Sequence, residues 1–576
     1  MSLLPYHKGN KTNFINLLFT LTRYLSLKHL AMKNVEWLWR NSACARWYIV
    51  ANIFLCSVSI GLNLFFIWLS KSLVDVATIT HDRQHLVVCG ILLFLSVILR
   101  VLVNALKAHV ESISFYRTVF NMRQHLFDGL LKSQWTGKDS HHSGDTISRV
   151  FTDAETVASV VCQDFPALVS SMLQLIAAYI FLSMLDFRLA VVIIAVAPFF
   201  FALSKIFFRR MRKLSRQIRD TESVVQSHIQ ESLQHKTVVQ SMLQGDAVGD
   251  RLDRLQSEEM GTVRKRTGFS IFSSSAVSAA FGIGYSIALL WGVFGIYSGT
   301  VTFGILTAFL QLVGQIQGPS MRIARQISSF VNASVAADRL MEIDGGEKED
   351  EGSQILVEAP AGISIDNLTF RYPDGDRFIF NAFSHDFVPG SRTAVIGETG
   401  AGKSTLIRLM LSLLKPVSGT VRIYSGCGEG EKDGIEVSAL TRTNFIYVPQ
   451  GNTLFSGSLR ENLLMGNPDA TEQMLWDALD VAAADFVREL PEGLDTVCGE
   501  FGTGLSEGQA QRIAVARGLL RSGSILLLDE FSSSLDNETE ERLLRNLSSS
   551  AVGKTIIFIT HRDNVVKYCD NVLEIR

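Results

Sequence analysis

The chain has 576 residues, of which 47% are hydrophobic and 19% are charged, and its formal net charge is −2. This length predicts two to four domains, and the charged fraction lies below the roughly 25% of a soluble globular domain. The near-neutral charge argues against a protein that wraps nucleic acid. The seven cysteines are scattered and never form a C-x-x-C pair, which excludes a disulfide framework and a zinc site.

The first segment, residues 1–45, is amphipathic rather than membrane-spanning. Arg23 and Lys28 interrupt its apolar residues, so the unbroken apolar core of a signal peptide is missing. We therefore expect an amphipathic segment that lies in the membrane interface.

Six apolar stretches of spanning length follow within residues 46–343. They cover about 47–70, 86–106, 165–185, 187–208 and 270–297, and the sixth begins near residue 302. A helix of roughly 20 residues crosses the apolar core of a bilayer. The alternative is a set of buried helices in a soluble protein, which six such stretches with few charges disfavour. The sequence predicts a membrane α-helical bundle of six transmembrane helices.

The connections between these stretches predict the orientation. The second-to-third and fourth-to-fifth connections are long and rich in Lys and Arg, whereas the third-to-fourth and fifth-to-sixth are short and carry few positive charges. Basic loops stay in the cytoplasm. We expect a multi-pass integral protein, in a bacterial inner (plasma) membrane, with a cytoplasmic N-terminus and a cytoplasmic soluble domain.

The remainder of the chain changes character. Residues 344–355 are polar and acidic, contain glycine and read as a linker. In residues 356–576, short aliphatic strands such as "RTAVIG" and "TIIFIT" alternate with helical segments. This alternation predicts an α/β domain with a mostly parallel sheet.

The first motif with a chemical role in this domain is a candidate phosphate-binding loop. The stretch "GETGAGKST" fits G-x-x-x-x-G-K-[ST] between a strand and a helix, so backbone N–H groups and the helix N-terminus would hold phosphates. Lys403 would reach the β- and γ-phosphates, and the Ser404 hydroxyl would hold Mg²⁺. A glycine-rich turn without a ligand is the alternative. The nucleotide-binding candidates here are Gly397, Glu398, Thr399, Gly400, Ala401, Gly402, Lys403, Ser404 and Thr405.

The second chemical element is "ILLLDE", a buried strand that ends in two carboxylates. Asp529 can organise Mg²⁺, and Glu530 can activate the attacking water. Alone this signal is weak, but together with the phosphate loop it indicates a P-loop NTPase that uses ATP and Mg²⁺.

The stretch "LSEGQ" closely resembles the signature motif of ATP-binding cassette (ABC) ATPases, and further family elements occur in the expected order. Tyr372 looks like the aromatic residue that stacks on adenine, Gln450 like the Q-loop glutamine, "SSLD" like the D-loop and His561 like the switch histidine. Taken singly, each has a plain reading as a packing, turn or loop residue. Six spans ahead of one cassette resemble an ABC exporter half-transporter.

The resemblance implies a dimer, with a homodimer and a heterodimer equally compatible with one sequence. Two ATP molecules would lie between the phosphate loop of one cassette and the signature residues Ser506, Gly508 and Gln509 of the other. Glu530 would be the general base, His561 would contact the γ-phosphate, and Gln450 would sense it and join the Mg²⁺ ligands.

ATP would drive export or flipping of a hydrophobic or amphipathic lipid, drug or peptide. A nucleotide-gated channel on the same scaffold is the alternative, and a soluble ABC ATPase that acts on DNA or ribosomes is disfavoured by the spans.

Several features depart from the family or carry no assignment. The signature has Glu507 where the family most often has glycine, and residues 425–434 form an unusually long polar hairpin. Coupling segments are expected near 152–157 and 228–242. Arg100 is a charge inside a predicted span and so a candidate functional residue, or it snorkels or pairs within the bundle. Gln311, Gln315 and Gln317 in the sixth span could line a cavity or bond neighbouring helices.

Overall fold

The computed structural model describes residues 36–135, 143–372, 375, 377–426, 434–499, 502 and 504–575. Most of the predicted interfacial segment and most of the 425–434 hairpin therefore lie outside the described residues. The chain divides into two compact units, one of Met1–Phe127 and Ile147–Ile343, the other of Asp128–Thr146 and Asp344–Arg576. In this division Asp128–Thr146 group with the second unit, and the predicted domain bounds stay predictions.

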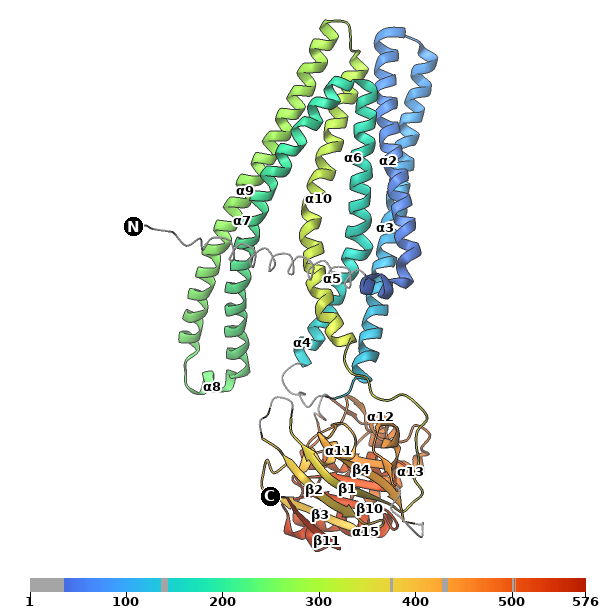
Figure 1. Ribbon diagram of the computed structural model, residues 1–576, viewed down its shortest axis with the longest axis vertical. Helices are drawn as coiled ribbons and strands as arrows, with labels where there is room; N and C mark the ends of the chain where they lie inside the picture. Colours follow the sequence, from blue (N-terminus) through green and yellow to red (C-terminus); the bar gives the residue numbers. More distant parts are fainter. Residues whose placement is uncertain are drawn as a thin grey trace, which may run out of the picture. The chain divides into compact units, whose positions relative to one another are not determined.

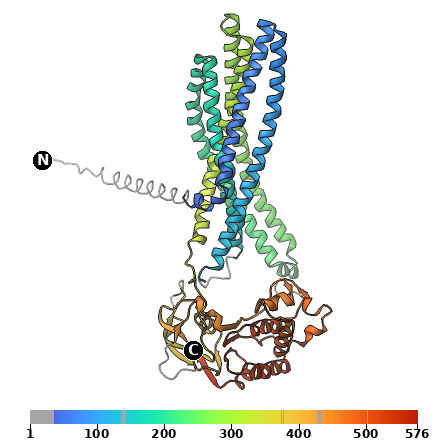
Figure 2. The ribbon, with the colours of Figure 1, turned by 90° about the vertical axis from the view of Figure 1, so that its right-hand side faces the viewer.

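The first unit consists of long helices (Figures 1 and 2). They are α2 (Arg46–Asp75), α3 (Arg83–Leu131), α5 (Ala154–Ser159), α6 (Phe165–Leu185), α7 (Phe187–Gln234), α8 (Lys236–Ser241), α9 (Gly245–Tyr297) and α10 (Phe303–Asp344). The short helix α4 (Ser143–Ser148) begins a continuous helical stretch that runs to Leu185. α6 packs against α2 and α7, and α7 pairs with α9 along its length. The membrane α-helical bundle expected from the sequence is confirmed as the fold class.

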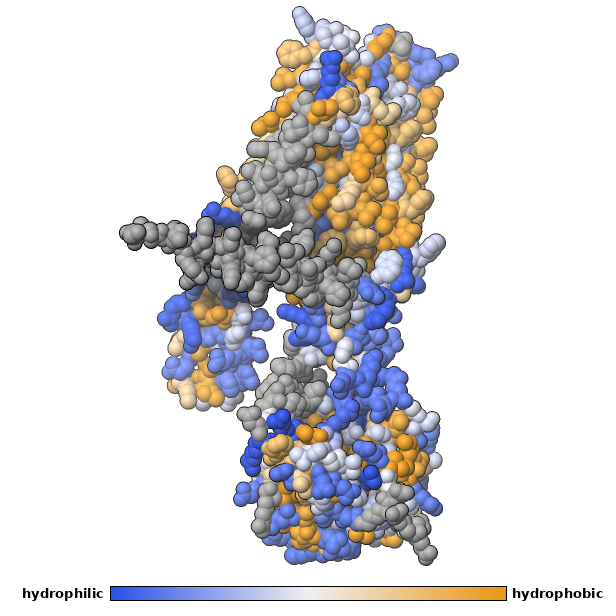
Figure 3. All heavy atoms as spheres, viewed as in Figure 1, coloured by the Kyte–Doolittle hydropathy of each residue, from blue (hydrophilic) through white to orange (hydrophobic). Residues whose placement is uncertain are grey.

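Four helical stretches of the described chain are long and apolar enough to cross a membrane: Ala43–Ile79, Arg83–Leu131, Thr146–Leu185 and Gly245–Tyr297. Large apolar side chains are exposed along them, and Figure 3 shows these side chains gathered over the upper parts of the helices. The predicted fourth and sixth spans lie in α7 and α10. The glutamines of α10 lower its hydropathy, and both spans stay predictions.

Polar contacts fix the helix ends in the first unit. The Asp75 carboxylate, at the end of α2, accepts from the Gly304 N–H at the start of α10 at 3.0 Å, where it complements the positive end of the helix dipole. Any Cβ on Gly304 would collide with the backbone of α2 at Lys71. Asp186 caps α7 and accepts from the Trp291 indole at 2.8 Å.

The second unit contains an antiparallel sheet, ordered β2-β1-β4-β5, and a parallel sheet, ordered β11-β3-β10-β9-β6. The antiparallel strands are β1 (Ala361–Phe370), β2 (Phe380–Phe387), β4 (Ser418–Ser425) and β5 (Ile435–Glu436). The parallel strands are β3 (Arg392–Gly397), β6 (Phe445–Val448), β9 (Ile525–Asp529), β10 (Thr555–Ile559) and β11 (Asn571–Ile575). The described helices include α11 (Lys403–Met410), α12 (Leu459–Leu464), α13 (Glu472–Val481), α14 (Glu507–Leu519), α15 (Asn537–Ser550) and α16 (Asp563–Val566), and β7 (Gly457–Ser458) pairs with β8 (Val497–Cys498).

The parallel sheet explains how distant motifs meet. β9 and β10 are buried along their whole length, as expected for aliphatic strands covered on both faces. Because the strands run parallel, the carboxyl ends of β3, β6, β9 and β10 lie at one edge. The phosphate loop, Gln450, Glu530 and His561 each follow one of these ends. The α/β class expected from the sequence is confirmed.

The predicted coupling segments lie within the first unit. In residues 152–157, Asp153 is 3.8 Å from Arg339 and Glu155 is 2.6 Å from Arg123. α8 falls in the second predicted segment, 228–242. A different stretch packs inside the second unit: the Trp135 ring contacts the core around β1 and α11, and the Gln134 N–H donates to the Glu347 carbonyl at 2.8 Å.

Candidate nucleotide-binding and hydrolysis site

The phosphate loop connects β3 to α11 and depends on its glycines. Gly400 and Gly402 adopt φ values of 88° and 101°, which favour residues without a Cβ. The Lys403 ammonium folds back onto the loop and donates to the Gly397 and Glu398 carbonyls at 2.7 and 3.1 Å. Burial lowers the pKa of Lys403. The Lys403 ammonium therefore lies at the centre of the loop and is bound by two backbone carbonyls. An anionic ligand can replace these carbonyls as its partner.

A second cluster stands beside this lysine, formed by Glu530, Gln450 and His561. One Glu530 carboxylate oxygen accepts from the Gln450 amide at 2.6 Å, and the other lies 3.4 Å from the His561 Nε2. The same imidazole nitrogen is 2.9 Å from the Lys403 Nζ. Glu530 has a φ of 45°, unusual for a residue with a side chain. Three chain segments thus fix the orientation of one carboxylate.

Asp529 precedes Glu530 and is buried, with 3% of its surface exposed. Burial raises its carboxyl pKa to about 6, and a hydrogen bond from Ser404 acts in the opposite direction. Its Oδ1 is buried and has no hydrogen-bond partner among the described residues. A buried carboxylate oxygen without a partner beside a serine hydroxyl fits a hard divalent cation such as Mg²⁺.

Tyr372 lies against the helix that leaves the phosphate loop. Its hydroxyl is 3.1 Å from the Thr405 Oγ1, and Arg408 donates to it at 3.4 Å. The Arg408 guanidinium also stacks on the Trp135 ring, with 4.5 Å between Cζ and the ring centroid. This chain of contacts, from Thr405 to Trp135, was not predicted from the sequence.

The signature residues lie at the start of α14. Ser506 and Gln509 form a reciprocal capping box, with distances of 2.9 and 3.2 Å. Gly508 is needed because a Cβ there would stand 2.7 Å from the Ser534 carbonyl oxygen. Glu507 occupies the first turn of α14, where a negative side chain complements the helix dipole.

Within the described chain, the polar contacts of Ser506, Gly508 and Gln509 do not reach residues 397–405. The structure brings together the phosphate loop, Gln450, Asp529, Glu530 and His561, and leaves the signature residues as a separate surface of the same domain.

Arg562 links the switch histidine to the D-loop. Its guanidinium donates to the Leu535 and Ser533 carbonyls at 3.0 and 2.8 Å and pairs with buried Glu540 at 3.3 Å. The D-loop also receives a 3.1 Å hydrogen bond from Gln511 of α14 to the Ser533 hydroxyl. Adjacency to His561 in "ITHR" was the only available sequence signal for Arg562.

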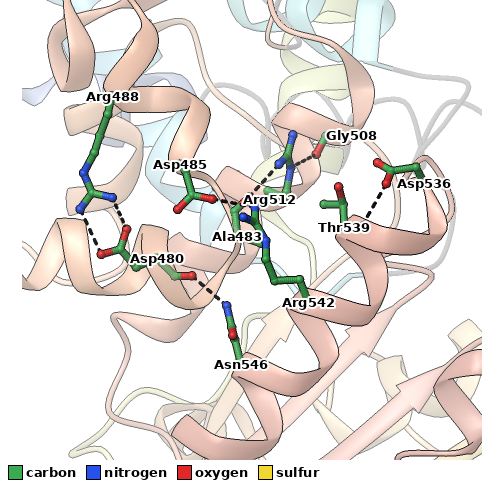
Figure 4. Close-up of polar contacts among 10 residues, drawn as sticks. All are labelled: Asp480, Ala483, Asp485, Arg488, Gly508, Arg512, Asp536, Thr539, Arg542 and Asn546. Atoms are coloured by element: carbon green, nitrogen blue, oxygen red, sulfur yellow. Dashed lines mark hydrogen bonds and ion pairs between the residues drawn. The ribbon is translucent and has the colours of Figure 1, made fainter.

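Two further arginines join α14 and α15 to the turn after α13 (Figure 4). Arg512 donates to the Ala483 carbonyl at 2.7 Å and Arg542 donates to the same oxygen at 3.1 Å. Arg542 also pairs with Asp485 at 2.6 Å. Together these contacts fix the signature helix relative to the helix that follows the D-loop.

A helical bundle suited to a membrane, joined to a P-loop ATPase domain, defines the class of this protein. The chain matches the ABC transporter transmembrane region over residues 49–320 and the ABC transporter family over residues 380–533. Relatives in Staphylococcus aureus strains NCTC 8325 and Mu50, both named as multidrug export ATP-binding/permease proteins, are 28% identical over 541 residues. The matches cover 92% of this chain and 93% of each relative.

A solved structure of a bacterial Atm1-family ABC exporter with ATP bound shares the fold, with a TM-score of 0.78 and 22% identity. The alignment covers 92% of this chain and 93% of that chain. The chain belongs to the ABC transporters and has the exporter arrangement, in which a transmembrane domain precedes the cassette. It is an ATPase coupled to transport.

Proposed function

We propose that the chain is one half of a dimeric exporter that moves a hydrophobic or amphipathic lipid, drug or peptide across a membrane at the expense of ATP. The observation that carries this proposal is the fixed Glu530 carboxylate, held between Gln450 and His561 beside Lys403. Rapid hydrolysis needs such a base, whereas a nucleotide-gated channel does not.

Glu530 acts as the general base and accepts a proton from the water that attacks the γ-phosphate. Gln450 and His561 orient it, and His561 also contacts the γ-phosphate. Lys403 exchanges its loop carbonyls for the β- and γ-phosphates, while Tyr372 stacks on adenine. Ser404, Asp529 and Gln450 would hold Mg²⁺, which supplies charge neutralisation for the phosphates.

A second half-transporter completes each ATP site, because the described polar contacts of the signature residues do not reach their own phosphate loop. Ser506, Gly508 and Gln509 of one chain serve the nucleotide bound by the other. A homodimer and a related heterodimer both satisfy this geometry, and membrane lipids surround the helices.

Coupling includes the stretch Lys132–Trp135 beside the predicted segments 152–157 and 228–242. Its support is the packing of Trp135 on Arg408, which in turn contacts Tyr372. A Tyr372 ring that stacks on adenine shifts its hydroxyl and so alters the position of Arg408.

The basic connections support a cytoplasmic N-terminus and a cytoplasmic cassette. A bacterial inner membrane is the proposed location, since ATP is available there on the cassette side.

ATPase activity of the purified full chain in lipid tests the proposal, beside Glu530→Gln and the exposed control Glu492→Gln. We expect activity in the wild type and the control, and a loss of about 100-fold or more in Glu530→Gln. Activity that survives Glu530→Gln would refute the assigned base. A well-folded but inactive wild type would exclude a self-sufficient homodimer.

A further inference from the structure

A polar cluster lies among the apolar helices of the first unit and joins α6 to α10. The Gln174 amide nitrogen donates to the Gln315 carbonyl oxygen at 2.6 Å, and the Arg322 guanidinium donates to the Gln174 carbonyl oxygen at 2.8 Å. Both glutamines are half-buried and Arg322 is exposed. One fixed amide therefore holds a guanidinium in place on the bundle.

The face of α10 that carries this arginine is open. Gly314, Gly318 and Arg322 follow one another at four-residue spacing, so they share one stripe of the helix. All three are exposed, and a Cβ on either glycine would meet nothing within 4 Å. Gln311, one helical turn before the amide at 315, continues the polar side of the helix. The stripe is therefore an open face of small residues that ends at Arg322.

Among the described residues, Arg322 forms a hydrogen bond with Gln174 and no ion pair with a carboxylate. α6 contains no Asp or Glu, and α10 contains none before Asp338. The acids of the first unit lie at helix ends or in the long extensions; Asp75 binds Gly304 and Asp186 binds Trp291. Asp164 precedes α6, and its backbone carbonyl accepts from Gln326, one turn beyond Arg322.

An ionisable group on a helix predicted to span the membrane is a candidate functional residue. Arg322 lies near the middle of α10, and it is exposed. A fork of N–H donors that is only partly used by one amide can also bind a carboxylate or phosphate.

We propose that Gln174, Gln315 and Arg322 form a cargo-binding site for the anionic group of an amphipathic molecule. The inference rests on the proposed export function and adds the charge class of the cargo. The apolar part of that molecule would lie along the glycine stripe, where side chains leave room. Arg100 is a useful contrast, since it donates to Asn63 at 3.1 Å and stacks on Phe66, in the α2–α3 pair.

The test measures binding of charge-matched probes to the full chain in phosphatidylcholine nanodiscs without nucleotide. Carboxyfluorescein and rhodamine 123 share a dye skeleton and differ in charge, and lysophosphatidylglycerol and lysophosphatidylcholine do the same for lipids. We expect the anionic member of at least one pair to bind about tenfold more tightly, the lower range for a hydrogen bond to a charged group. The pair that responds distinguishes a soluble anion from a lipid headgroup.

Variants localise the effect. Arg322→Gln should remove the anion preference, Arg322→Lys should keep part of it, and Arg100→Gln, which deletes the same charge elsewhere, should keep all of it. Equal binding within both wild-type pairs, a cation preference, or a preference that survives Arg322→Gln would overturn the inference. If Arg322→Gln does not fold, the inference is tested by the anion-to-cation affinity ratios of the wild type and of Arg322→Lys.

Failure of this inference is separable from failure of the proposed function. ATPase activity that depends on Glu530 without an anion preference refutes only the cargo site. An anion preference in a chain whose ATPase activity does not depend on Glu530 refutes the assigned hydrolysis machinery and leaves the site intact.

Discussion

Replacing Asp529 by asparagine should stabilise the nucleotide-free cassette while it abolishes hydrolysis. The Asp529 carboxyl has a pKa of about 6 in the folded chain against a reference of 3.8, because burial disfavours its charge. At 1.36 kcal/mol per pKa unit, ionised Asp529 lowers the free energy of unfolding by about 3 kcal/mol at pH 7.5. Asparagine is neutral and nearly isosteric, so this cost disappears.

The pH dependence has a definite sign. The folded pKa lies above the unfolded value, so the unfolded state releases its proton first as the pH rises. The destabilisation by ionised Asp529 is therefore small below about pH 4, reaches about half of its full value at pH 5 and is complete above about pH 7. The stabilisation of Asp529→Asn over the wild type should shrink in the same way on acidification.

Thermal unfolding of the full chain in detergent, without nucleotide, provides the assay. For a domain of this size, about 3 kcal/mol corresponds to a rise in Tm of about 6–12 °C at pH 7.5. The exposed control Asp469→Asn should change little. With Mg²⁺ and ATP the order should reverse, because only the wild type gains binding energy at this carboxylate. A variant that is no more stable than the wild type, or whose advantage grows toward acid pH, would refute this reasoning.

Three other substitutions test the geometry of the cassette. Gly508→Ala places a Cβ 2.7 Å from the Ser534 carbonyl oxygen, so ATPase activity should fall at least several-fold. The control Gly249→Ala, in open space, should leave ATPase activity unchanged. Equal ATPase rates in the two variants would contradict the tight contact at Gly508. Arg512→Ala leaves the Ala483 carbonyl with one donor. The substitution should lower the free energy of unfolding by about 1–3 kcal/mol, measured as a lower Tm of the cassette. Trp135→Ala should leave ATP affinity within about twofold, measured by nucleotide titration, and abolish cargo-stimulated hydrolysis; full stimulation in this variant would exclude the proposed coupling route.

The site was predictable where local sequence and topology agree. "ILLLDE" reads as a buried strand ending in carboxylates, and parallel pairing then brings Glu530 close to Gln450 and His561. The arginines were not predictable, because Arg512 and Arg542 bind a backbone carbonyl. That carbonyl belongs to Ala483, which adopts a φ of 54° in the turn after α13. No pattern of side chains in the sequence predicts that this carbonyl accepts from two arginines.

The contact of Trp135 was not foreseen for a similar reason. Residues 152–157 lie in the continuous helical stretch from Thr146 to Leu185, and their coupling role stays a prediction. The stretch that packs on the cassette contains Trp135, whose role depends on Arg408 far along the chain. Long-range pairing of this kind leaves no local trace.

The contact between Asp75 and Gly304 has a consequence for the synthesis of the chain. α10 is not among the four described stretches that are apolar enough to cross a membrane, and each glutamine in it opposes partition into lipid. Its N-terminus binds a carboxylate at the end of α2, and Gly304 allows the two backbones to approach closely. The first long helix of the described bundle thus offers a contact to the N-terminus of the last one. We expect insertion of the predicted sixth span to be an assembly step that depends on this contact as well as on hydropathy.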